Sequence, residues 1–343
     1  MDTRKVQKLG ESTLAMTLPV EWRREHNVKK GDSLTTQFNG RGSLTVIPET
    51  INRSETEAVI HAEKDLKKQA LERIIIAQYV LGRKSIVIKS SGKLTNAQAT
   101  AVYEAERQLM GLSIIEETPE KISVRSSVDT EDFRIDNMIE RLKNTGLTMR
   151  NEAVKSLIHG NMELAERALN REKQANKIFV LLLRLIFTTY QNPQQVQAVG
   201  VQDGFTLIGY HSIAKNLELA ADDAEDIATT VVESEGKKLD VNKKTVRNIN
   251  DFNTQVGELN TLAIDAATEQ NYDLYQKCIS KFQDIKVSKE NMLEEIPEIQ
   301  NTELLRIRQV VASLYHTSEY AVRNAEIAAN FALSQDSEYI TIN

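Results

Sequence analysis

The chain has 343 residues, of which 41% are hydrophobic, and this is enough to bury the cores of two or three domains. Only 5 proline and 14 glycine residues are present, so the composition predicts a mainly α-helical protein. A net charge of −6 excludes a uniformly basic nucleic-acid-binding protein, although residues 1–50 contain eight Lys/Arg against six Asp/Glu.

Three features of the sequence favour a cytoplasmic location. The single cysteine, Cys278, cannot form an internal disulfide, which suits a reducing compartment. The first residues lack the apolar segment of a signal peptide. The longest apolar run, Ile178 to Phe187, is too short to span a bilayer and contains Arg184. This run is therefore expected to form a buried helix of a bundle.

Residues 1–50 are predicted to form a small β-rich module. The expected elements are strands at 4–9 and 13–18, a short helix beginning at Pro19, and strands at 33–38 and 43–47 joined by a turn at 39–42. About fifty residues bury little core by themselves. A module of this size is therefore expected to pair with a second copy of itself.

The order of these elements and four short motifs carry a resemblance. The motifs Arg-Lys-Val, Leu-Gly, Glu-Trp-Arg-Arg and Lys-Lys-Gly-Asp resemble the SpoVT/AbrB family of dimeric, swapped-hairpin DNA-binding domains over residues 3–49. In that family, basic residues of the first strand and short helix face DNA phosphates, which give affinity without sequence information. The resemblance assigns this role to Arg4, Lys5, Lys8, Arg23 and Arg24.

An alternative for this module is that it serves only for dimerisation. AbrB-type members often place a basic residue directly after Leu-Gly. This chain has Glu11 and Ser12 there, which is closer to the antitoxin-like and archaeal members.

Residues 51–128 are predicted to form a small α/β connector. The expected elements are a long helix over 55–79, a strand over 85–89, a helix over 96–110, and a hairpin of 113–117 with 121–125. Glu57 and His61 would lie one turn apart on the first helix, but a pair without further ligands is not a metal site. We interpret the region as a spacer, with an oligomerisation or sensing element as the alternative.

Residues 129–338 are predicted to form six long helices. The helical runs are 132–159, 161–190, 203–233, 241–269, 271–294 and 301–333. The motif at 161–164 recurs at 271–274, and the motif at 226–228 recurs at 326–328. This internal repeat predicts two related three-helix bundles, at 129–235 and 236–338.

An acidic stripe marks the third of these helices. Glu218, Asp222 and Asp226 follow one another at intervals of four residues, so they share one helix face. Like charges at this spacing cost roughly 0.2–0.5 kcal/mol per pair, so the stripe needs water, a basic partner or a cation. A solvated surface is the simplest interpretation.

The stripe also resembles a family motif. Glu-x-x-x-Asp-x-x-x-Asn/Asp followed by Ile-Ala is typical of PhoU domains, which are pairs of three-helix bundles that regulate phosphate uptake. The resemblance implies a divalent or iron-type metal ion held by this motif and by an acidic pair on the preceding helix. The expected ligands are Glu172, Glu218, Asp222 and Asp226, with Asn176 in the place of the second acid of the pair.

The second repeat is expected to bind no metal. Its corresponding residues are Phe282, Lys286, Ser318, Val322 and Glu326. One carboxylate remains there beside a resident lysine, so an apolar and neutralised site has no electrostatic reason to bind a divalent ion.

Together, the chain resembles archaeal-type PhoU proteins with an N-terminal SpoVT/AbrB-like domain. The resemblance implies a cytoplasmic homodimer that binds DNA and regulates transcription in the phosphate response. The alternative is an adaptor that does not bind DNA and negatively regulates a phosphate transporter or sensor. An enzyme is not expected, because the sequence lacks Glu-x-x-His, His-Glu-x-x-His, Cys-x-x-Cys and phosphate-loop motifs.

Overall fold

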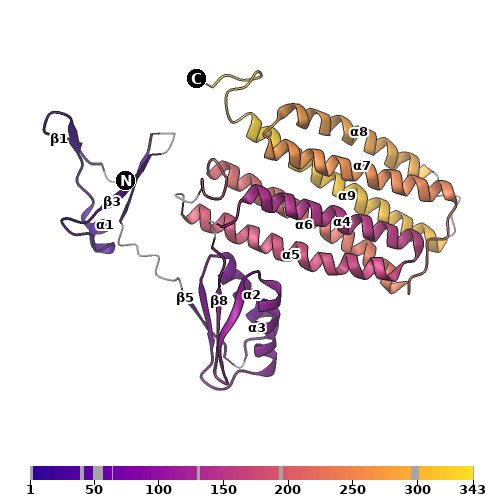
Figure 1. Cartoon of the computed structure of the whole chain (residues 1–343), viewed down its shortest axis with the longest axis horizontal. Coiled ribbons are helices and arrows are strands. Elements are labelled where there is room, and N and C mark those ends of the chain that lie inside the picture. The colour runs from indigo at the N-terminus through magenta and orange to yellow at the C-terminus, as the bar shows by residue number, and fades with distance from the viewer. Residues whose placement is uncertain are drawn as a thin grey trace. The chain divides into compact units, whose positions relative to one another are not determined.

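The computed structural model describes residues 3–38, 42–48, 57–63, 65–129, 132–192, 196–294 and 301–342. The chain divides into two compact units, Met1–Thr56 and Glu57–Asn343. Figure 1 shows the elements of both units. No helix among the described residues is long and apolar enough to cross a membrane.

The first unit contains two hairpins around a short helix. β1 (Gln7–Leu9) pairs antiparallel with β2 (Thr13–Ala15), and β3 (Leu34–Phe38) pairs antiparallel with β4 (Leu44–Pro48). Between the hairpins lies α1 (Val20–Glu25), which begins directly after Pro19. The predicted elements are thus present, but residues 39–41 of the predicted turn lie outside the described residues.

The second unit begins with an α/β domain. Its elements are β5 (Glu57–His61), α2 (Lys68–Val80), β6 (Ser85–Lys89), α3 (Asn96–Gln108), β7 (Leu112–Thr118) and β8 (Lys121–Ser126). The sheet order is β5-β6-β8-β7, with β5 parallel to β6 and the other neighbours antiparallel. Helices α2 and α3 cover one face of the sheet (Figure 1).

The predicted helix over 55–79 is wrong in its first part. Residues Glu57–His61 form β5, where Ile60 is buried and pairs with Ile88 of β6. Ladder bonds to β6 and burial of Ile60 outweigh the local helical pattern. Glu57 and His61 therefore do not lie one helical turn apart.

Six long helices follow, close to the predicted boundaries. They are α4 (Ile135–His159), α5 (Met162–Gln191), α6 (Gly204–Glu233), α7 (Lys243–Thr268), α8 (Tyr272–Glu294) and α9 (Asn301–Ala332). Side-chain caps define several N-termini, because Asn161, Asp203 and Asn242 accept hydrogen bonds from the first turns of α5, α6 and α7.

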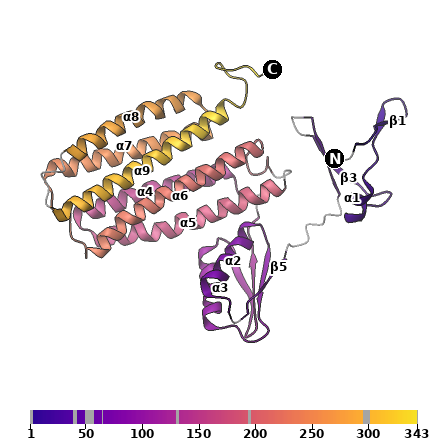
Figure 2. The ribbon, with the colours of Figure 1, turned by 180° about the vertical axis from the view of Figure 1, so that it is seen from behind.

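These helices form two bundles that share one core. Helices α4, α5 and α6 pack together, as do α7, α8 and α9. The bundles meet through contacts of α4 with α7 and of α6 with α9, which Figure 2 shows from behind. One continuous cluster of buried apolar side chains runs through both. The predicted fold class, mainly α with two three-helix bundles, is confirmed.

A buried arginine joins the α/β domain to the first bundle. Arg184 of α5 is 2% exposed and donates hydrogen bonds to the carbonyl oxygens of Tyr79, Gly82 and Arg83 at the end of α2. Its guanidinium also lies over the Tyr79 ring, 4.7 Å from the ring centroid. A helix C-terminus favours a positive charge, so this position suits an arginine. Arg184, the charged residue that interrupts the apolar run of α5, therefore connects the α/β domain to the first bundle.

Candidate functional site

The acidic stripe of α6 faces α5 at its Glu172. Desolvation raises the pKa of Glu172, and repulsion from Glu225 and Asp222 raises it further. Although much of Asp222 is exposed, desolvation of its carboxyl and repulsion from Glu218 raise its pKa to about 6. The structure therefore brings the acids of α5 and α6 into one electrostatically strained face.

Two further acids belong to this region and were missed from sequence. Glu225 lies three residues after Asp222 and acts on both Glu172 and Asp222. Asp223 faces α9 instead, where Thr317 donates to it at 3.5 Å and His316 Nδ1 lies 3.8 Å away. Burial, followed by repulsion from Asp226, raises the pKa of Asp223 to about 7. Glu225 also lies on the helix face of Glu218 and Asp222, because residues three and four positions apart share a face. This spacing could have identified Glu225 from the sequence.

The four predicted metal ligands are not equally placed. Glu218 is paired with Lys215, one turn earlier on α6. Asp226 is exposed and acts on Asp222 and Asp223. Within the described parts of the chain, no three His, Cys, Asp or Glu side chains are grouped closely enough to hold a metal ion. Side-chain rotation would be needed to bring these oxygens onto one ion, so metal binding stays a prediction.

The corresponding face of the second bundle has a different chemistry. Phe282 of α8 stacks on Tyr315 of α9, with ring centroids 5.9 Å apart. The ammonium group of Lys286 lies 4.6 Å from the Phe282 centroid, and that of Lys289 lies 3.5 Å from the Tyr315 centroid. Aromatic rings and cations thus replace the carboxylates of the first bundle. Ser318 is buried and Glu326 is exposed.

The predicted DNA contacts are all on the surface of the first unit. Arg4 and Lys5 precede β1, Lys8 lies on β1, and Arg23 and Arg24 lie in the last turn of α1. All five are exposed. Their accessibility allows contact with phosphates.

The same unit exposes much of its apolar surface. Val28 is buried, whereas exposed apolar side chains occur along both hairpins. They are Val6, Leu9, Leu14, Met16, Phe38 and Leu44, and Phe38 is 79% exposed. Apolar residues exposed at this density on a small unit indicate an interaction surface.

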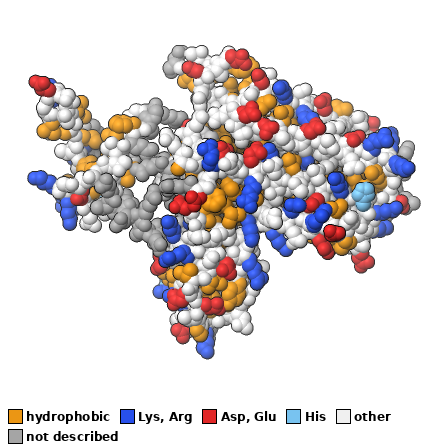
Figure 3. Space-filling view, viewed as in Figure 1, with side chains coloured by type: hydrophobic (Ala, Val, Ile, Leu, Met, Phe, Trp, Pro, Cys, Tyr) orange, Lys and Arg blue, Asp and Glu red, His pale blue; other side chains and the backbone are white. Residues whose placement is uncertain are grey.

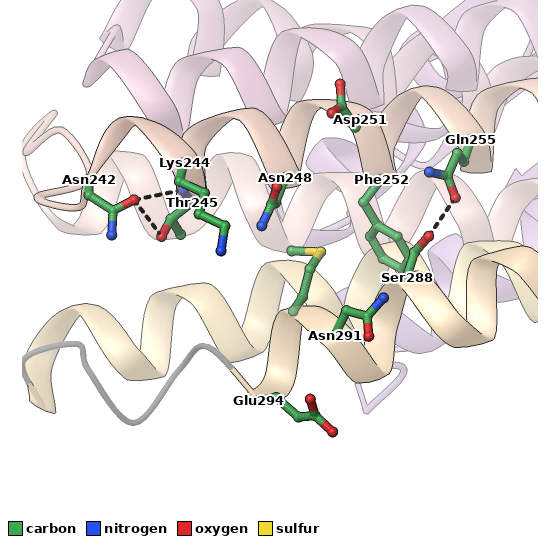
Figure 4. Close-up of a pocket in the computed structure, with 11 residues that line it drawn as sticks. Asn242, Lys244, Thr245, Asn248, Asp251, Phe252, Gln255, Ser288, Asn291 and Glu294 are labelled. Atoms are coloured by element: carbon green, nitrogen blue, oxygen red, sulfur yellow. Dashed lines mark hydrogen bonds between the residues drawn. The ribbon is translucent and has the colours of Figure 1, made fainter.

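The helical array has a mixed surface and a polar groove. On the face in Figure 3, acidic and basic side chains are interspersed over the array. A groove of about 650 Å³ lies between α7 and α8 (Figure 4). There Asn242 accepts from the backbone N–H of Thr245 at 2.9 Å, and Ser288 donates to Gln255 at 3.0 Å. These bonds cap α7 and join the two helices, so they are structural.

Comparison with known proteins finds relatives of the helical part. Residues 139–231 match the family model of the PhoU domain. These residues are therefore similar to a PhoU domain. The crystal structure of PhoU from Pseudomonas aeruginosa is similar with a TM-score of 0.51, over 59% of this chain and 96% of that chain, at 18% identity. At this identity the likeness shows a shared fold.

The first unit also has a relative among protein families. Residues 7–54 match the family model of the antidote-toxin recognition domain MazE, a bacterial antitoxin. No curated protein matches the chain. The predicted resemblance, a PhoU-like region after an N-terminal AbrB-like or antitoxin-like region, is thus confirmed.

Proposed function

We propose that this protein regulates the phosphate response by binding DNA as a homodimer through its first unit. The observation that carries the proposal is the combination of a PhoU domain with an antitoxin-like unit whose basic side chains are exposed. Phosphate contacts from exposed arginines and lysines supply most non-specific DNA affinity. The exposed apolar side chains of the hairpins favour a second copy as their partner.

Salt dependence of DNA binding tests this proposal. Two copies of Arg4, Lys5, Arg23 and Arg24 would neutralise up to about eight phosphates, so log K should fall with log[salt] with a slope of about −5 to −7. Replacing Arg23 and Arg24 by Ala removes about four of these contacts per dimer and should flatten the slope by about 3 to 4. Filter binding to genomic fragments at several salt concentrations measures this slope for the parent and for the variant.

A matched control uses the same unit. Lys29 and Lys30 are also exposed but lie in the turn after α1. Their replacement by Ala should leave the slope nearly unchanged. Equal slopes for the parent and the Arg23/Arg24 variant would remove the DNA-binding role and favour the adaptor, in which the first unit only dimerises.

Metal binding at the first bundle is a second proposal, independent of DNA binding. Carboxylate oxygens of Glu172, Glu218, Asp222 and Asp226 are ligands that a hard cation prefers, and a cation would relieve their repulsion. Protein purified without chelator should contain metal. Glu218→Gln combined with Asp222→Asn should abolish it. Glu326→Gln, on the exposed surface of α9, should leave it unchanged.

The second bundle supplies the reason for that control. Its aromatic rings and lysines leave Glu326 without further acids at the corresponding positions. Metal that persists in the double variant would show that the acidic face of α6 is a solvated surface. Metal lost on changing Glu326 would show that the repeat was aligned wrongly.

A further inference from the structure

A second buried arginine lies where the two bundles meet. Arg150 of α4 is 3% exposed, and α4 packs against α7 at this junction. Its Nε donates to Oδ1 of Asn253 on α7 at 2.8 Å. Asn253 in turn donates from Nδ2 to Oδ1 of Asn151 at 2.8 Å. This chain of bonds fixes the plane of the guanidinium through one of its three nitrogens.

Among the described residues, the Arg150 side chain donates only from Nε, and its other two nitrogens have no acceptor there. No described carboxylate forms an ion pair with Arg150 either. Asn253, which accepts the hydrogen bond from the guanidinium, is a neutral amide. Burial without a counter-charge lowers the pKa of Arg150 to about 10. A buried charge without a partner is costly, so this arrangement calls for an explanation.

Arg184 shows how the same protein satisfies a buried guanidinium in another place. There, three backbone carbonyl oxygens accept from the terminal nitrogens. Arg150 instead lines a cavity, and no hydrogen bond from its terminal nitrogens occurs among the described residues. The contrast indicates that the partner of Arg150 is not among the residues that the structure describes.

The cavity beside Arg150 has a volume of about 440 Å³ and lies between α4 and α7. Gly257 of α7 makes room for the guanidinium, because a Cβ at this position would lie 2.6 Å from Nη2 of Arg150. Two carboxylates also border the cavity, and both lie near lysines, although Lys143 is shared between Asp265 and Glu140, which lies 2.6 Å from it. Glu258 pairs with Lys281 at 2.5 Å, and Asp265 lies 3.7 Å from Lys143. Among the described residues that line this cavity, Arg150 is the cation, and neither carboxylate forms an ion pair with it.

We propose that this cavity binds a tetrahedral oxyanion of the phosphate class, held by the terminal nitrogens of Arg150. The fork of a guanidinium matches two oxygens of such an anion, and the bound anion supplies the missing negative charge. The inference deepens the proposed function, since a regulator of the phosphate response needs a ligand that reports phosphate. A ligand here would contact α4 of one bundle and α7 of the other.

Thermal unfolding of the full chain in a phosphate-free buffer tests the proposal. Inorganic phosphate should raise the melting temperature by roughly 2 °C for each tenfold increase above its dissociation constant, because only the folded state binds it. Sodium chloride at equal ionic strength should not. Sulfate tests whether the tetrahedral shape of the anion matters. If sulfate raises the melting temperature as much as phosphate does, the result supports a site for tetrahedral oxyanions in general. No rise with phosphate, or an equal rise with chloride, would overturn the proposal.

Two variants assign the effect to this cavity. Arg150→Met should keep or raise the melting temperature without phosphate, because it removes an uncompensated buried charge, and it should lose the response to phosphate. Gly257→Ala keeps the charge but forces the guanidinium to move, and should weaken phosphate binding at least tenfold. Arg141→Met, an exposed change on the same helix, is the control and should respond as the parent does.

A response that survives in both cavity variants would place the anion elsewhere and overturn the inference. The outcome is independent of DNA binding. Protein that binds DNA with the expected salt slope but ignores phosphate would contradict this inference alone. Protein that binds phosphate through Arg150 but not DNA would contradict the DNA-binding role alone.

Discussion

Replacement of Arg184 by methionine is expected to lower the free energy of unfolding by on the order of 3–5 kcal/mol. The change removes hydrogen bonds to the carbonyl oxygens of Tyr79, Gly82 and Arg83 and leaves them between α2 and α5. Each lost hydrogen bond from a charged donor costs about 1.5–3 kcal/mol, although the Tyr79 carbonyl keeps one bond, from the Gly82 N–H. The contact of the cation with the Tyr79 ring is lost as well.

The loss should also separate the α/β domain from the first bundle. Calorimetry of the parent should show the two parts unfolding together, whereas the Arg184→Met protein should unfold in two resolved steps. Lys173→Met, an exposed change on the same helix, is the control and should shift stability by less than about 0.5 kcal/mol. An Arg184→Met protein with the melting profile of the parent would show that the carbonyl contacts contribute little.

Gly160→Ala is expected to destabilise the first bundle by about 2–4 kcal/mol. Gly160 ends α4 in the left-handed region, with φ of +66°, which costs alanine about 1 kcal/mol. A Cβ there would also lie 2.3 Å from the carbonyl oxygen of Gly236 and 2.7 Å from the backbone nitrogen of Lys238. Both are backbone atoms and cannot rotate away. The α4–α5 connection, which contains Gly160, and the α6–α7 connection, which contains Gly236 and Lys238, would therefore have to separate.

Gly146→Ala is the matched control. Gly146 lies inside the same helix, and no atom lies within 4 Å of the position that its Cβ would take. This change should stabilise the protein by about 1 kcal/mol, since alanine has the higher helix propensity. Urea unfolding followed by circular dichroism measures both variants. If both variants changed the free energy of unfolding in the same direction, the result would contradict the close backbone contact at Gly160.

The helical elements were predicted well because their signals are local. Apolar periodicity extends over a few turns, and a cap acts within three residues, as Asn161 does on Leu164 and Asp203 on Thr206. The repeat at 161–164 and 271–274 is likewise visible by comparing the chain with itself. Such signals need no knowledge of what lies across the core.

The acidic site was predicted only in part for the same reason. The four-residue spacing of Glu218, Asp222 and Asp226 is a local pattern, so the stripe was found. That the charge of Glu225 raises the pKa of Glu172 on α5 depends on how α5 and α6 pack. The direction of Asp223 toward His316 depends in turn on the packing of α9.

The sequence by itself determined the helical class, the boundaries of the long helices, the internal repeat and the acidic stripe. Only the tertiary structure decided that Glu57–His61 is a strand, because its partner β6 lies beyond α2. It also decided the partners of the two buried arginines. Arg184 meets Tyr79 across 105 residues, and Arg150 meets Asn253 across 103. Compensation of a buried charge is a property of the packed core, and no local pattern specifies it.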